Sequence, residues 1–227
     1  MNRRNALTLG GIFAASSMLH AEVKQTIKVN MAYGANHEIK PLPFDPKSLQ
    51  GISEKVIVSH HDNNYAGAVK KLRLIQKQIS LLPDTAHPIE YGALKREELI
   101  ALNSKILHEL YFDNLGGKGS VSEKMKKLLS ESFGSYEMWQ KDFIQTAKSL
   151  SGGSGWVILG YVKEAGVLIN QISSDHSDNA ATSRPLLVMD MYEHSYHMDY
   201  GTKADQYIDS FLKNVNWENI EKRWDSV

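Results

Sequence analysis

Cysteine is absent from the 227 residues, so no disulfide can stabilise this chain. The chain also lacks an excess of either charge, because 26 Lys and Arg balance 26 Asp and Glu. This balance gives no reason to expect a nucleic-acid or membrane-surface partner. Internal repeats and low-complexity segments are also missing. What remains is a globular composition with 42% hydrophobic residues, enough for one sizeable core or two small domains that share a face.

The N-terminus has the plan of a secretory signal. Arg3 and Arg4 precede an apolar stretch at 6–18 that is too short to span a bilayer, and Ala21 offers a small residue for cleavage. We therefore expect residues 1–21 to be an export signal and the protein to be exported, to the periplasm, with no membrane attachment after signal removal. The paired arginines suggest the twin-arginine route, which carries folded proteins. An uncleaved N-terminal anchor is the alternative.

Hydrophobic periodicity predicts a helical N-terminal half. Residues 22–40 are weakly patterned and are expected to form an extended arm. Residues 41–118 are expected to form a long helical hairpin domain, with helices at 53–82 and 95–112. Each helix has a predicted apolar face, which consists of Tyr65, Val69, Leu72, Ile75 and Ile79 in the first and of Leu99, Leu102, Ile106 and Leu110 in the second.

The pattern changes in the second half of the chain. Residues 119–227 are expected to form an α/β domain in which short β-rich runs follow two amphipathic helices and precede two more. The predicted class is α+β, a long helical hairpin domain followed by an α/β domain with a small three-stranded antiparallel sheet. The strands are expected at 156–161, 167–169 and 186–189, and the helices at 122–130, 135–150, 204–212 and 217–224.

Four side chains are candidate metal ligands. Asp190 and His194 directly follow the third predicted strand, while His60 and His108 lie one on each helix of the predicted hairpin. An antiparallel hairpin could bring the two helical imidazoles together, and imidazole with carboxylate suits first-row ions such as iron and manganese. The residues alone leave another interpretation open, in which Asp190 caps a turn and the histidines are ordinary polar or core residues.

Several motifs give the chain a resemblance to a known family. They are LPF at 42–44, ISEKVIVSHH at 52–61, LHELYF at 107–112, GGSGW at 152–156 and DMYEHSYHMDY at 190–200. Over residues 42–224 the chain resembles the iron/manganese superoxide dismutase family, in which Asp-x-Trp-Glu-His supplies two metal ligands. Tyr192 stands where that family usually has tryptophan, a difference that concerns the wall of the pocket more than the metal.

The resemblance implies a role for each matching position. It implies that His60, His108, Asp190 and His194 bind one iron or manganese ion per chain between the two domains. It further implies that His176 and Trp156 lie in the outer sphere or wall of the site, that Glu193 and Tyr196 bridge the subunits of a homodimer, and that Lys203 steers the substrate. His61 is expected to line the pocket.

The position of the family's gateway tyrosine departs from the family pattern. That tyrosine usually follows the first ligand by eight residues, where this chain has Ala68, and Tyr65 is the nearest phenol. We expect Tyr65 to approach the substrate channel in its place.

The activity that the resemblance implies is the conversion of superoxide to dioxygen and hydrogen peroxide by alternate reduction and oxidation of the bound ion. Two alternatives stay open at this point. One is an exported metal-binding protein of the same fold with little or no dismutase activity. The other is a mononuclear zinc hydrolase, although no general base can be assigned for it.

Overall fold

The computed structural model describes residues 32–178, 181 and 183–227. The predicted export signal, residues 1–21, and the first part of the predicted arm lie outside the described residues. No helix in the described part of the chain is long and apolar enough to cross a membrane.

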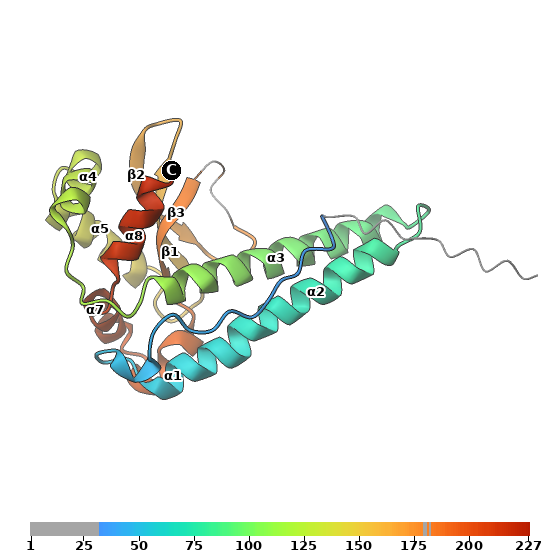
Figure 1. Ribbon diagram of the computed structural model, residues 1–227, viewed down its shortest axis with the longest axis horizontal. Coiled ribbons are helices and arrows are strands. Elements are labelled where there is room, and N and C mark those ends of the chain that lie inside the picture. Colours follow the sequence, from blue (N-terminus) through green and yellow to red (C-terminus); the bar gives the residue numbers. More distant parts are fainter. Residues whose placement is uncertain (1–31, 179–180, 182) are drawn as a thin grey trace, which may run out of the picture.

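The N-terminal half is a long helical hairpin (Figure 1). The first side of the hairpin consists of α1 (Glu54–Ser59), a π-helical segment (His60–Tyr65) and α2 (Ala66–Leu81), and the second side is α3 (Pro88–Asp113). Ser53 caps α1, as predicted, because its side chain accepts a hydrogen bond from the backbone N–H of Val56. The second helix starts earlier than the predicted residue 95, because Pro88 occupies the first turn, where no backbone N–H is needed.

The predicted buried face of α3 is wrong at two positions. Leu99 and Ile106 are 42% and 40% exposed, whereas Ala101, Leu107 and Tyr111 are buried. The helix packs against α2 over its outer part and against β3 at its C-terminal end, so its partners select which side is covered. Apolar spacing within the helix alone does not carry that information.

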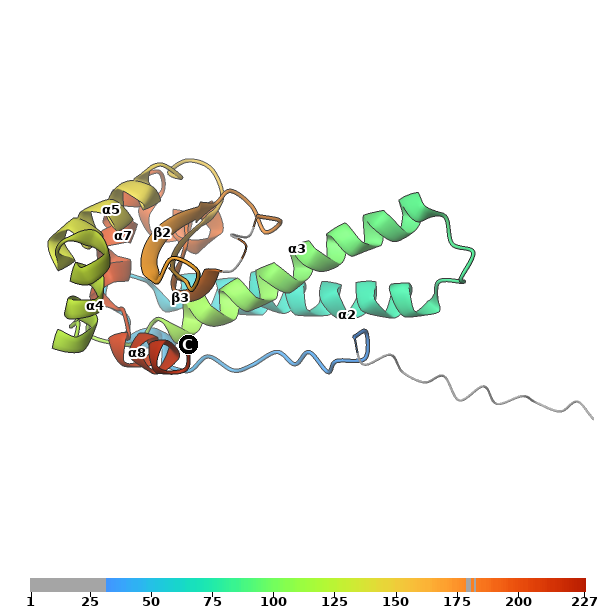
Figure 2. The same ribbon diagram turned by 90° about the horizontal axis from the view of Figure 1, so that it is seen from above.

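The arm runs alongside the hairpin (Figure 2). Tyr33 is hydrogen-bonded through its hydroxyl to the hydroxyl of Tyr91 at 3.2 Å, and Nε2 of His37 lies 3.1 Å from Oε1 of Gln76. Residues 34–42 have no regular secondary structure. Side chains of both hairpin helices therefore hold this extended segment in place.

The C-terminal half contains the predicted three-stranded antiparallel sheet, with strand order β2-β1-β3. The α+β class is confirmed. The elements of this half are α4 (Glu123–Phe133), α5 (Tyr136–Lys148), β1 (Trp156–Val162), β2 (Val167–Ser173), β3 (Ser183–Asp190), α6 (His197–Tyr200), α7 (Ala204–Lys213) and α8 (Trp217–Asp225), with a short 3-10 turn at Glu193–Ser195. A second 3-10 turn, Pro46–Ser48, precedes α1 in the N-terminal half.

The end of β3 is anchored from both halves of the chain. Trp156, at the start of β1, pairs with Asp190, at the end of β3. From the helical side, Asn114 donates from its side-chain amide to the backbone carbonyl of Val188 at 3.0 Å. Residues of α1, α3, the sheet and α7 share one continuous hydrophobic core. The last residue of β3 is therefore held against the hairpin by packed and hydrogen-bonded neighbours.

Candidate metal centre

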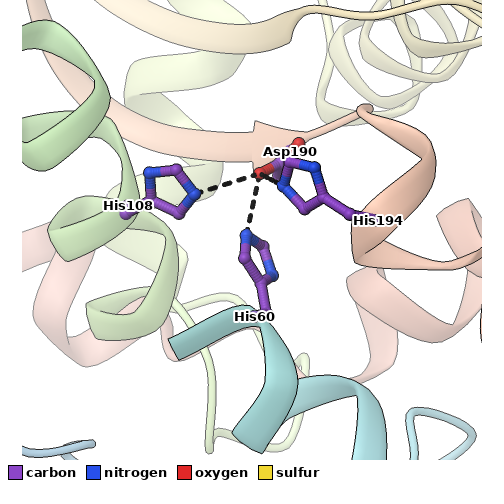
Figure 3. A group of neighbouring side chains, drawn as sticks. All are labelled: His60, His108, Asp190 and His194. Carbon is purple, nitrogen blue, oxygen red and sulfur yellow. Dashed lines mark hydrogen bonds and ion pairs between the residues drawn. The ribbon is translucent and has the colours of Figure 1, made fainter. Parts of the chain in front are cut away.

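Four side chains from separate elements meet between the hairpin and the sheet (Figure 3). His60 begins the π-helical segment, His108 lies near the end of α3, Asp190 ends β3 and His194 lies in the 3-10 turn that follows. Each offers one ligand atom, and these atoms all lie within 4.8 Å of one another. The four residues singled out in the sequence are thus brought to one point.

His60 sits at a break in helical regularity. The π-helical segment that it begins is wider than an α-helix, and single π turns occur frequently at functional sites. The ring is fully buried and meets the rings of His108 and His194 edge-on, with centroids 4.9 and 4.8 Å apart. Burial lowers the pKa of His60, although the neighbouring Asp190 opposes this effect, so the imidazole is held neutral.

His108 is oriented by its own helix. Its Nδ1–H donates to the backbone carbonyl of Ser104 at 2.6 Å, because a carbonyl oxygen can only accept. This bond leaves Nε2 of the neutral ring with a free lone pair on the side of the cluster. Burial, followed by the unfavourable interaction of a second proton with the neighbouring ring of His60, lowers the pKa of His108 to about 3. The result is an oriented, neutral nitrogen, which is the form that binds a metal ion.

Asp190 faces all three imidazoles with one oxygen. Its Oδ2 lies 3.0 Å from Nε2 of His60, 3.3 Å from Nε2 of His194 and 3.8 Å from Nε2 of His108, while Oδ1 accepts the backbone N–H of Tyr192 at 2.8 Å. Burial by itself would raise the pKa of this carboxyl group. The rings of His194 and His60 outweigh that effect and hold its pKa well below the usual range, so Asp190 is a carboxylate.

Two hydroxyl groups support the backbone of Asp190, and sequence reasoning missed both. Tyr207 and Ser195 donate to its carbonyl oxygen at 2.8 and 2.9 Å, and the hydroxyl of Tyr207 also lies 3.2 Å from the hydroxyl of Tyr111. The ring of Tyr111 lies 5.0 Å from that of His60. Tyr207 lies in α7, where its spacing marks only a buried position, so no local signal could have assigned its hydroxyl to Asp190.

The cluster leaves buried nitrogen atoms that no described protein group satisfies. Both ring nitrogens of His60 and Nε2 of His108 make no hydrogen bond in the described part of the chain, and the 3.0 Å approach of His60 to Asp190 lacks hydrogen-bonding angles. An unsatisfied buried polar group costs about 1–3 kcal/mol, which a cation bound by the Nε2 lone pairs would offset. Three imidazole nitrogens and one carboxylate oxygen suit iron or manganese, so the residues fit one such ion.

Trp156 and His176 lie beside the cluster. The ring of Trp156 lies 5.1 Å from that of His108, and its Nε1–H donates to Nδ1 of His176 at 3.0 Å. A neutral His176 therefore carries its proton on Nε2. Tyr192 stacks on His176 and on His194, with centroids 5.0 and 5.3 Å apart. Together these rings form a wall on one side of the four candidate ligands.

Tyr65 lies near the cluster, but its hydroxyl is bonded to the arm and to α3. It donates to Oε1 of Glu109 at 3.0 Å and accepts the backbone N–H of Lys40 at 2.9 Å. Burial raises the pKa of Tyr65 to about 12. Its ring centroid is 6.4 Å from that of His108, and Ala68 is buried. The gateway role of Tyr65 stays a prediction, and its hydroxyl is already used in holding the arm.

A groove of about 330 Å³ adjoins this side of the site. It lies between the arm, the π-helical segment, α3 and α8, and His61 and Tyr65 contribute to its wall. Phe112 lines the groove and also packs 5.2 Å from the ring of His60. His61 therefore lines a pocket, as the sequence suggested, and does not belong to the ligand cluster.

The three remaining predicted residues are Glu193, directly before His194 in the chain, and Tyr196 and Lys203, which follow it. Glu193 is exposed next to it, and the side chain of His194 is 28% exposed while the other three candidate ligands are buried. Tyr196 is buried and stacks on Tyr207 at 5.1 Å. Lys203 is exposed directly before α7. Roles in subunit contact for Glu193 and Tyr196, and in steering for Lys203, stay predictions.

Comparison with known proteins gives a consistent result. Residues 121–223 match the model of the iron/manganese superoxide dismutase C-terminal domain. The chain is 49% identical over 189 residues to an iron superoxide dismutase of Cupriavidus metallidurans, covering 83% of this chain and 96% of that relative. It is 34% identical over 201 residues to an iron superoxide dismutase of Aquifex aeolicus, covering 84% and 93%. It is 31% identical over 198 residues to a manganese superoxide dismutase of Halobacterium salinarum, covering 85% and 97%.

Proposed function

This chain belongs to the iron/manganese superoxide dismutase family, and on that premise we propose that it converts superoxide to dioxygen and hydrogen peroxide with one bound iron or manganese ion. The observation that carries this proposal is the buried cluster of His60, His108, Asp190 and His194, whose unpaired nitrogens fit such an ion. The alternative of a metal-binding protein without turnover has less support, because the relatives over most of the chain are named as dismutases.

The residues of this chain prepare the site for an anionic substrate. Bound iron or manganese supplies the one-electron couple that the disproportionation of superoxide requires. Burial keeps the imidazoles of His60 and His108 neutral, so Asp190 is the one anionic group among the four and cancels only part of the charge of a cation. The site therefore keeps a positive charge that attracts superoxide.

Access and proton supply also follow from the chain. In the single chain, the partial exposure of His194 leaves its side of the cluster open to solvent. Trp156 covers the site beside His108 and keeps the proton of His176 on Nε2, where it can serve as a hydrogen-bond donor. Such donors outside the ligand shell adjust the redox potential of a bound metal.

The protein is further proposed to be exported to the periplasm after removal of residues 1–21. The support is the sequence pattern, in which Arg3 and Arg4 precede a short apolar stretch. From the change in hydrophobic periodicity along the chain, the mature protein is also proposed to consist of the arm, a helical domain at 41–118 and an α/β domain at 119–227. N-terminal sequencing of protein isolated from the periplasmic fraction tests the cleavage site, and recovery of the intact chain from membranes would favour an anchor.

A homodimer is proposed because Glu193 is exposed beside His194 on the open side of the cluster. In this arrangement Glu193 reaches the equivalent histidine of the second subunit. Glu193→Ala is expected to shift the mass measured by analytical ultracentrifugation toward the monomer at low protein concentration. Glu218→Ala, which removes an exposed glutamate of α8, is the matched control. A monomeric wild type would contradict the proposal.

The activity is tested on the mature chain loaded separately with iron, manganese or zinc. Metal content is measured for each preparation, and the decay of superoxide is followed by stopped-flow absorbance. Rapid decay is expected with iron or manganese and not with zinc, because zinc has no redox chemistry. A protein that binds iron or manganese stoichiometrically and leaves superoxide decay unchanged would contradict the proposed function.

A further inference from the structure

Asn103 connects α3 to the turn that carries His176. Its side-chain Nδ2–H donates to the backbone carbonyl of His176 at 2.8 Å. We propose that Asn103 is a positioning residue of the metal centre, which acts by fixing the place and the proton of His176. The proposal rests on the proposed function, because it concerns how a bound redox metal is tuned.

The turn that carries His176 does not by itself determine its distance from the site. Hydrogen bonds inside the turn, such as that from the Ser174 N–H to the carboxylate of Asp178 at 2.9 Å, give it a local shape. The bond from Asn103 joins this shape to α3, the helix that also carries His108. Asn103 therefore links the turn to the helix of a candidate ligand.

The ring of His176 is held by residues of its own, C-terminal half of the chain. Trp156, on β1, donates to its Nδ1 at 3.0 Å, and Tyr192 stacks on it with an interplanar angle of 13°. The ring centroid is then 6.1 Å from that of His108. Two anchors fix this residue, one on the backbone from α3 and one on the ring from β1. If the bond from Asn103 is lost, the distance between Nε1 of Trp156 and Nδ1 of His176 is no longer fixed. The proton of His176 can then move from Nε2 to Nδ1.

One turn of α3 thus serves two residues of the site. The carbonyl of Ser104 accepts the Nδ1–H of His108, and the neighbouring side chain of Asn103 holds His176. Asn103 is only partly buried, so its side chain can be replaced without opening the core. Groups that hydrogen-bond to metal ligands typically change metal affinity or activity by about 10- to 100-fold when they are altered. Asn103 acts one step further out, through His176, so we expect an effect at the lower end of that range.

The test is the midpoint potential of the full-length mature protein loaded with iron or manganese, measured by a mediated redox titration. We expect Asn103→Ala and Asn103→Leu to change the ratio of oxidised to reduced metal at a fixed potential by about tenfold, equivalent to about 59 mV for a one-electron couple. Leu keeps the approximate size and the neutral charge of the side chain but has no N–H donor. Asn219→Ala is the control, because Asn219 makes the same kind of bond to a carbonyl of α3, that of Asp113, but does not contact the turn that carries His176.

A double-mutant cycle with His176→Ala separates positioning from general loosening. If Asn103 acts through His176, the double variant should have the potential of His176→Ala alone. The inference is overturned by an unchanged potential in Asn103→Ala, by a shift that persists without His176, or by an equal shift in the control. Should Asn103→Ala not fold, Asn103→Leu carries the same cycle. A wild type that shows no iron or manganese couple overturns the proposed function as well, so the two failures are distinguishable.

Discussion

Acid should destabilise the metal-free protein through the buried histidines. The pKa of His108 is about 3 in the folded chain, against an ordinary value of 6.5. Between these two values the unfolded chain binds a proton that the folded chain does not, so the free energy of unfolding falls as the pH falls. At 1.36 kcal/mol per pKa unit, His108 alone accounts for a loss of about 2 kcal/mol between about pH 7.5 and about pH 5. His60, whose pKa is also lowered by burial, adds to the loss.

The measurement compares wild type with His108→Leu, both metal-free, by urea unfolding followed by tryptophan fluorescence at the two pH values. The other titrating groups are common to both chains, so they largely cancel in the difference. The free energy of unfolding of His108→Leu minus that of wild type should therefore be about 2 kcal/mol larger at the lower pH than at the higher pH. His197→Leu, which removes an exposed imidazole of α6, is the matched control. A difference between wild type and His108→Leu that is independent of pH would refute the argument.

Two further substitutions probe contacts around the site. Arg223→Ala is expected to lower the free energy of unfolding by about 2–3 kcal/mol, because the largely buried guanidinium bonds Asp113 and donates to the carbonyl of Leu186 at 2.9 Å. Urea unfolding measures this change. A change below about 0.5 kcal/mol, as at an ordinary surface position, would contradict the prediction. Tyr65→Phe should cost about 1 kcal/mol and speed proteolysis of the arm, because the bond to the Lys40 N–H is lost. Loss of superoxide turnover at unchanged stability would instead favour a gateway role for the hydroxyl.

The elements of the fold were predictable because their signals are local. The cap at Ser53, the apolar stripe of α2 and the alternation of short β-rich runs each depend on neighbouring residues, and the three-stranded sheet and the hairpin follow from them. The covered face of α3 was not predictable in this way. Leu99 and Ile106 have helical apolar spacing but stay exposed, because the partners of α3 lie on a different side of the helix.

The four candidate ligands were also identified from the sequence, because their motifs resemble those of a metal-binding family, whereas residue type and spacing alone left an ordinary structural role open. Their surroundings were not. The Tyr207 hydroxyl on the carbonyl of Asp190 and the Asn103 amide on the carbonyl of His176 join residues that are distant in the chain. Neither residue belongs to a motif that would give it such a partner.

Local patterns along the chain were therefore sufficient to identify the class of fold, and the resemblance of its motifs was sufficient to identify the family and the candidate donor atoms. Packing between remote segments was needed to show which nitrogen of His108 is free, where the hydroxyl of Tyr65 is bonded and how His176 is held. The physical reason is that protonation and hydrogen bonding depend on burial and on the direction of a few contacts between remote segments. Those contacts exist only once the hairpin and the sheet have packed together.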